Sequence, residues 1–262
     1  MNFFFSINNE KLDCSLTIPK FKNNEQINKK YILFSSQIKN NKWLIEEVTC
    51  QNNENFYFLK NLDLDNHKIF FLAKKEEVKR ENIFLELQNF NNYTDNTDIM
   101  PDFRSNMKIE IKNKGFSSYQ ADYPYNLSLK TGNVLSPVST LLNRSADKNI
   151  IFFKNIYFKP VKKEFFIYFV DVNKKKILHK VKAFTNQTNQ INVESELIQS
   201  QNYIFTGGYL GIPIYVCIKN DHLSMEHTHP PHLYIWGYDK FEKIEKIKKE
   251  INEIINKKVS KI

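Results

Sequence analysis

Four of the six histidines lie between residues 222 and 232, in the segment DHLSMEHTHPPHLY, at positions His222, His227, His229 and His232. On a β-strand, His227 and His229 would point to the same face, because side chains alternate with a period of two. Pro230-Pro231 then ends the strand and allows the chain to bring His232 back toward this pair. Three neutral imidazoles with an open fourth position form a catalytic zinc-type site, and iron also accepts imidazole ligands. We therefore predict a catalytic divalent transition metal, zinc or iron, bound by these three histidines.

Two other interpretations of the histidine cluster stay open. The rings could line a metal-free pocket and act as a general acid and base, since imidazole titrates near neutral pH. They could also be structural, with each ring nitrogen bound to the protein or to solvent.

A β-hairpin is expected to position these rings. Residues 213–219 and 223–229 have strand patterns, and Asn220-Asp221 between them favours a two-residue turn. The facing pairs are then Lys219 with His222, Ile218 with Leu223, Val216 with Met225 and Ile214 with His227. In this register the apolar side chains share one face, and His227 continues that face.

Arginine is rare in this chain, which makes its positions informative. Of the 38 basic residues, only Arg80, Arg104 and Arg144 are arginines. A planar guanidinium binds carboxylate or phosphate at two points, which an ammonium group cannot do. We predict that Arg104 belongs to the catalytic site and that Arg144 binds substrate. The alternative for both is an ion pair with Asp or Glu within the protein.

A second candidate for ligand contact is the tyrosine-rich segment GFSSYQADYPY, residues 115–125. Tyrosine rings often line sugar or peptide pockets, because the ring is apolar and its hydroxyl is polar. We predict that Tyr119 and Tyr123 bind substrate; the alternative is that they form an ordinary sheet face.

Short strand-like runs separated by turn residues dominate the chain. In the first hundred residues they lie near 2–7, 12–18, 31–37, 42–49, 55–60, 68–74 and 83–89. This spacing predicts an N-terminal β-sandwich over residues 1–100. The polar segment 89–102 separates it from a larger antiparallel β domain over residues 101–238, which carries the histidines. The expected fold class is therefore all-β.

Two helices are expected within this all-β fold. Apolar residues recur every three or four positions in the C-terminal segment, which predicts an amphipathic helix over residues 239–262. We expect it to dock on the sheet; an oligomerisation helix is the alternative. In SPVSTLL, Ser136 before Pro137 predicts the start of a short helix.

Composition excludes several classes of protein. The chain of 262 residues is 41% hydrophobic and 14% aromatic, which excludes a disordered chain, and no apolar run is long enough to cross a membrane. The net charge of +9 is dispersed and comes mainly from lysine, so neither nucleic acid nor membrane is expected as a partner. Three cysteines without a CxxC pair indicate reduced thiols and a cytoplasmic protein.

These observations favour an enzyme that uses the metal or the histidines to act on a small polar or anionic substrate. The alternative is a non-catalytic β-sandwich module that binds a glycan or a protein through its tyrosine-rich strands.

Overall fold

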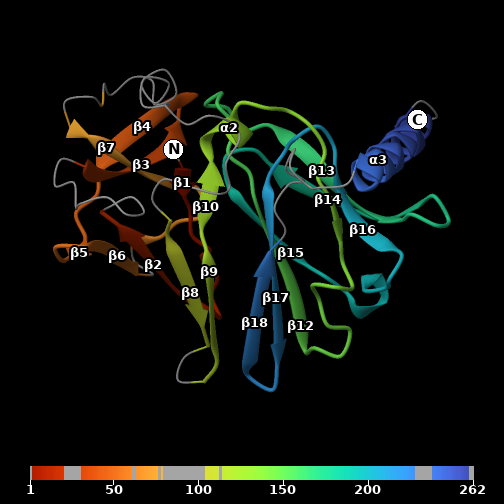
Figure 1. Cartoon of the computed structure of the whole chain (residues 1–262), viewed down its shortest axis with the longest axis horizontal. Helices are drawn as coiled ribbons and strands as arrows, with labels where there is room; N and C mark the ends of the chain where they lie inside the picture. Colours follow the sequence, from red (N-terminus) through yellow and green to blue (C-terminus); the bar gives the residue numbers. More distant parts are fainter. Residues whose placement is uncertain are drawn as a thin grey trace.

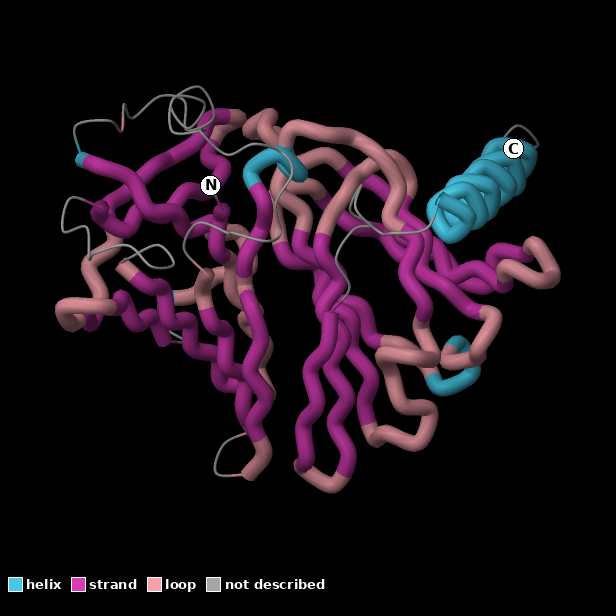
Figure 2. Tube along the Cα trace, viewed as in Figure 1, coloured by secondary structure: helices cyan, strands magenta, loops and turns pink. Residues whose placement is uncertain are grey.

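The computed structural model describes residues 2–20, 31–60, 63–75, 78, 104–111, 114–227 and 238–259. These residues form four small antiparallel sheets, arranged like the blades of a four-bladed propeller, and one long helix at the side of the molecule (Figures 1 and 2). The predicted all-β class is therefore confirmed. The predicted strand at 83–89 lies outside the described residues.

Each of the first two sheets combines strands from both sides of residue 100. Sheet 1 has the strand order β10-β1-β7-β3-β4, with β1 (Asn2–Phe4), β3 (Tyr31–Lys39), β4 (Lys42–Glu47), β7 (Ile69–Lys74) and β10 (Asp122–Pro124). Sheet 2 has the order β5-β6-β2-β8-β9, with β2 (Asp13–Pro19), β5 (Gln51–Asn52), β6 (Phe56–Lys60), β8 (Asn106–Glu110) and β9 (Phe116–Gln120). Strands β8, β9 and β10 thus complete sheets that begin in the first hundred residues. The division into domains at residue 100, and the sandwich, stay predictions.

The other two sheets are formed by the second half of the chain. Sheet 3 has the order β15-β12-β17-β18, with β12 (Lys148–Lys154), β15 (Thr188–Asn192), β17 (Ile212–Lys219) and β18 (His222–His227). Sheet 4 has the order β11-β16-β13-β14, with β11 (Leu135–Pro137), β13 (Glu164–Asp171), β14 (Lys176–Phe184) and β16 (Asn202–Thr206). The helical segments are α2 (Tyr125–Ser128), the 3-10 turn η3 (Ser195–Leu197) and α3 (Tyr238–Val259).

Sheet 3 is buried on both faces. Alternate residues of β12 face different cores: Ile150 and Phe152 pack with sheets 1 and 2, whereas Ile151 and Phe153 pack with sheet 4. A strand covered on both sides needs apolar residues at every position, which explains the continuous runs NIIFF in β12 and IPIYVCI in β17.

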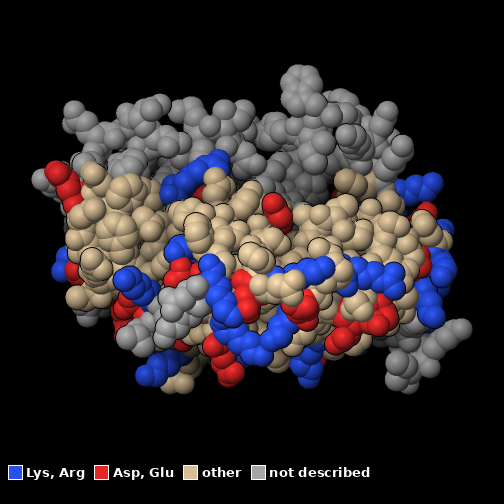
Figure 3. Space-filling view, turned by 90° about the horizontal axis from the view of Figure 1, so that it is seen from below, with Lys and Arg blue, Asp and Glu red and all other residues tan. Residues whose placement is uncertain are grey.

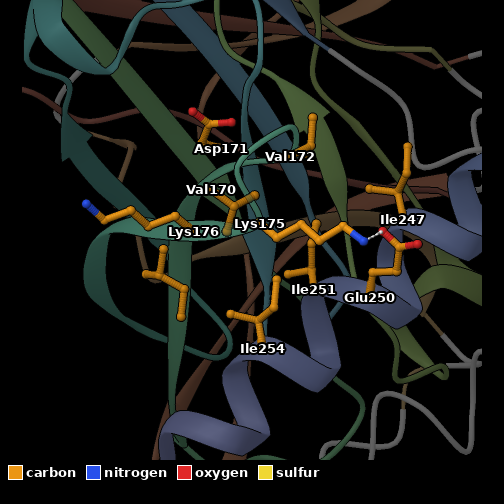
Figure 4. A pocket seen from close by; sticks show the side chains of 10 residues that line it. Val170, Asp171, Val172, Lys175, Lys176, Ile247, Glu250, Ile251 and Ile254 are labelled. Atoms are coloured by element: carbon orange, nitrogen blue, oxygen red, sulfur yellow. Dashed lines mark ion pairs between the residues drawn. The ribbon is translucent and has the colours of Figure 1, made fainter.

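Helix α3 confirms the predicted C-terminal helix and its docking on the sheet. Ile251 is buried against Tyr168, Val170 and Phe205 on the outer face of sheet 4. An ion pair of 3.3 Å between the Lys175 ammonium and the Glu250 carboxylate adds to this contact (Figure 4). The gap that remains beneath the helix has a volume of only about 10 Å³, so it is a packing gap rather than a ligand site.

The predicted short helix at Ser136-Pro137 is wrong. Ser136 and Pro137 end strand β11, where they pair with Ile204 and Tyr203. The chain then makes a single turn, in which the Leu142 N–H donates to the Val138 carbonyl at 2.9 Å. A proline can end an edge strand as readily as it can begin a helix, because it lacks an N–H in both places.

Lys154 is fully buried at the end of β12, between sheet 3 and the N-terminal half. Its ammonium donates to the carbonyls of Asn66 at 3.3 Å and Lys68 at 3.2 Å. Burial lowers the pKa of Lys154 to about 7, and the nearby Asp65 charge opposes this shift only in part. Lys154 continues the face of Ile150 and Phe152, so it places a titratable group where the pattern calls for an apolar one.

The lowered pKa of Lys154 predicts that the stability of the fold depends on pH. Its folded pKa of about 7 lies below the unfolded value of about 10.4, so between these values the unfolded state binds more protons. We expect the free energy of unfolding to rise with pH from about 7 to 8.5, by up to about 1.4 kcal/mol per pH unit. Urea denaturation at several pH values measures this slope.

Lys154→Met should remove this slope, and Lys130→Met, which changes an exposed lysine, should keep it. A Lys154→Met variant with the wild-type pH dependence would contradict the assignment.

Candidate functional site

The hairpin of β17 and β18 has the predicted register. Ile214 pairs with His227, Val216 with Met225, Ile218 with Leu223 and Lys219 with His222. The turn residues Asn220 and Asp221 have φ values of 48° and 62°. Such values at both positions are typical of the two-residue turns that match strand twist, and Asn and Asp tolerate them better than most residues.

His227 lies at the end of β18, on the strand face that carries Met225. Met225 packs in the core that sheet 3 shares with sheets 1 and 2. The His227 ring is half-buried and contacts the ring of Tyr119, with 3.9 Å between the ring centroids and 52° between the planes. The hairpin therefore places His227 against Tyr119 of sheet 2, and Tyr119 is also a predicted site residue.

Strands β9 and β18 bring these two rings together. They are edge strands of sheets 2 and 3 and lie side by side (Figure 1). Gly115, just before β9, lies close to the turn of the hairpin: a Cβ atom on it would be 3.0 Å from the Asp221 carbonyl oxygen. Because Gly115 meets the start of β18 and Tyr119 meets its end, the two strands run in the same direction. A side chain at residue 115 would push them apart.

Two charged residues affect the pKa of the Tyr119 hydroxyl. Burial raises the pKa of Tyr119, the Glu226 carboxylate raises it further, and the Arg104 guanidinium lowers it. Arg104 comes directly before the buried Ser105, and β8 pairs Met107 with Tyr119. Tyr119 and His227 are therefore in contact although they are far apart in the sequence, and the charge of Arg104 acts on Tyr119. The two-point contact of Arg104 with a carboxylate stays a prediction.

Asp122, which sequence reasoning missed, is a buried carboxyl beside Ser105, the residue that follows Arg104. Its Oδ1 accepts hydrogen bonds from the Ser105 N–H at 2.8 Å and the Ser105 hydroxyl at 2.9 Å. Its Oδ2 is buried and has no hydrogen-bond partner among the described residues. Burial raises the pKa of Asp122 to about 6, while the Ser105 bonds and the Arg104 charge act in the opposite direction. The signal available in the sequence was an acidic residue within the apolar run of β10.

Two predicted substrate contacts lie elsewhere. Tyr123 is fully buried, and its hydroxyl donates to the Ile156 carbonyl at 3.2 Å. Arg144 is exposed in the turn before β12. The neighbouring Ser145 accepts a hydrogen bond of 3.0 Å from Lys219, at the opposite end of the hairpin from His227.

The metal ligands predicted from the sequence are only partly described. His229 and His232 lie outside the described residues. Within the ranges that the structure describes, no group of three or more His, Cys, Asp or Glu side chains could hold a metal ion. The metal site of His227, His229 and His232 therefore stays a prediction.

Comparison with protein-family models, curated proteins and solved structures found no match. In the described part of the chain, no helix is both long enough and apolar enough to cross a membrane. On the face seen in Figure 3, lysine and arginine side chains are interspersed with acidic ones. This mixture agrees with the dispersed charge of the sequence.

The Asp122 contacts predict a large difference between two substitutions. Asp122→Ala removes both bonds to Ser105 and should lower the free energy of unfolding by about 2 kcal/mol at pH 7.5. Asp122→Asn keeps the Oδ1 acceptor and should lower the free energy of unfolding by a smaller amount. Urea denaturation of both variants checks this order.

The same carboxyl contributes to the pH dependence below neutrality. Its folded pKa of about 6 exceeds the unfolded value of about 3.9, so its contribution to stability falls as pH rises between these values. Asp122→Asn should abolish that contribution. An unchanged slope from pH 4 to 6 would show that Asp122 does not carry it.

Proposed function

We propose that this protein is an enzyme whose active site lies where β9 meets β18, with His227 at its centre. The observation that carries the proposal is the contact between His227 and Tyr119, with Arg104 and Glu226 acting on the same tyrosine. The contact joins a candidate base and a phenol from two separate segments, and both kinds of group serve in general acid–base catalysis.

Each residue has a role in this proposal. Arg104 binds an anionic group of a small polar substrate, because a guanidinium offers paired donors to a carboxylate or phosphate. His227, together with His229 and His232, holds a zinc or iron ion that activates water or polarises the substrate. Without the ion, His227 acts as a general base beside the Tyr119 hydroxyl.

The alternative, a non-catalytic module that binds glycan or protein, has less support. It relies on exposed tyrosine rings, whereas among the three tyrosines of residues 115–125, Tyr123 and Tyr125 are buried and only Tyr119 is partly accessible. One observation supports the binding module: Phe116, at the start of β9, is 64% exposed. A cytoplasmic location is part of the proposal as well, since Cys14, Cys50 and Cys217 form no disulfide bond.

The first test is the metal content of protein purified without a histidine tag. We expect about one zinc or iron ion per chain in the wild type, as in catalytic sites with three protein ligands. His227→Ala should lose the ion. His222→Ala should keep it, because His222 is exposed at the opposite end of the same strand.

The second test covers the metal-free form of the proposal. Turnover of p-nitrophenyl acetate and p-nitrophenyl phosphate is measured for wild type, His227→Ala and His222→Ala. Loss of turnover in His227→Ala alone supports an active site at this residue. A wild type that holds no metal and shows no His227-dependent turnover of either compound would overturn the proposal.

A further inference from the structure

The second half of the chain repeats the strand order of the first half. When β1 to β4 and β6 to β9 are matched in chain order with β11 to β18, sheet 1 corresponds to sheet 4 and sheet 2 to sheet 3. In this match, β14 at the edge of sheet 4 is the counterpart of β4 at the edge of sheet 1. The two strands can therefore be compared as edges of the same kind.

Strand β14 is the longer and more basic of these two edges. It has nine residues, KILHKVKAF, with three lysines, a histidine and no acidic residue. Its counterpart β4 has six residues, KWLIEE, with one lysine and two glutamates. For the residues that the structure describes, no backbone hydrogen bond joins residues 177–183 to an element other than β13. A long strand with an unpaired backbone edge can accept a further strand.

The positive charge of β14 is only partly balanced within the protein. Of its three lysines, one has a carboxylate partner among the residues with a described position: Lys182 pairs with Glu164 at 3.1 Å. Asp171 and Glu250 pair instead with lysines of the turn that precedes β14. An acidic group that approaches the free edge therefore meets uncompensated positive charge.

The side chains of β14 alternate between two faces of sheet 4. Lys180 pairs with Tyr168 on the outer face, and Lys182 follows on the same face. Val181 lies between them and pairs with Ile167, which belongs to the core between sheets 3 and 4. A strand added beside β14 would place alternate side chains next to the two lysines and the intervening one next to Val181. Such a strand needs acidic residues at alternate positions and apolar residues between them.

We propose that sheet 4 binds an extended acidic segment of a partner protein, which adds as a fifth strand alongside β14. Main-chain hydrogen bonds supply affinity in this mode of recognition, and the lysines select the acidic side chains. A second copy of this chain does not fit, because two β14 strands would place lysine against lysine.

Single-stranded nucleic acid is the other polyanion to consider, and it binds by stacking bases on exposed aromatic rings. On this face the rings are covered. The Lys180 ammonium lies over the Phe166 ring, 3.5 Å from its centroid, and Tyr168 packs with Ile251 of α3. The observations therefore favour the acidic peptide.

Fluorescence anisotropy of the full chain with three labelled probes tests the proposal. The probes are the alternating peptide GEVEVEVG, the rearranged peptide GEEEVVVG of the same composition, and an oligothymidylate. We expect the alternating peptide to bind most tightly. Equal affinity for the rearranged peptide, tighter binding of the oligonucleotide, or no binding of the alternating peptide at millimolar concentration would overturn the proposal.

Methylation of the peptide backbone separates strand addition from simple charge attraction. The N–H groups of a strand point alternately to its two edges, so only every second one can bond to β14. GEVEVEVG is therefore methylated either on the N–H groups of its glutamates or on those of its valines. We expect one of these peptides to lose binding and the other to keep it. Equal affinity of the two methylated peptides would contradict strand addition.

Charge reversal identifies the edge that binds. The double variant Lys180→Glu with Lys182→Glu should lose the acidic peptide and instead bind GKVKVKVG. The matched control is Lys39→Glu with Lys42→Glu, which changes the net charge equally at the exposed end of the β3–β4 hairpin. Circular dichroism confirms that both variants are folded. Wild-type affinity for GEVEVEVG in the first variant, or an equal loss in the control, would overturn the proposal.

Discussion

The junction between the two halves of the molecule depends on the buried amino group of Lys154. Lys154 is fully buried, and taking an ammonium group out of water costs several kcal/mol unless hydrogen bonds replace those of the solvent. Two backbone carbonyls of the Asn66–Lys68 turn supply such bonds. Thr188, which pairs with Lys154, adds two more contacts across the junction: its N–H donates to the Asn66 carbonyl and its hydroxyl to the Ser6 carbonyl.

This constraint determines where the other contacts can form. With the end of β12 fixed against the Asn66–Lys68 turn, the face of sheet 3 that carries Phe152, Ile214 and Val216 closes on the apolar faces of sheets 1 and 2. The same closure sets the edge strands β9 and β18 against each other and brings Tyr119 to His227. The proposed active site therefore lies at the junction and needs both halves of the chain.

Local patterns predicted local structure well. The hairpin register followed from the alternation of Ile214, Val216 and Met225, because a shift of one residue would have turned every apolar side chain to the other face. Asn40 and Asn41, between β3 and β4, have positive φ values, which asparagine tolerates better than most residues. The C-terminal helix followed from a stripe of isoleucines that only a period of 3.6 residues places on one side.

Long-range features could not be predicted in this way. No pattern within 101–124 indicates that β8, β9 and β10 pair with strands of the first hundred residues. The sequence of a strand shows that it is a strand but does not show which other strand it pairs with. Tyr119 and His227 were each singled out, but their contact depends on two sheet edges meeting. Asp122 and Lys154 were missed because their burial comes from tertiary packing, and a charged residue in a strand usually faces solvent.

The pairing of β1 also affects how the chain folds during synthesis. Phe4 pairs with Phe70 on one side and with Asp122 on the other. Ribosomes add about 5–20 residues per second, so β10, the later of the two strands that pair with β1, is synthesised several seconds after β1. During that interval an apolar strand with Phe3, Phe4 and Phe5 has an unpaired edge, which other chains could occupy. Sheet 1 is therefore completed late, after β10 has been synthesised.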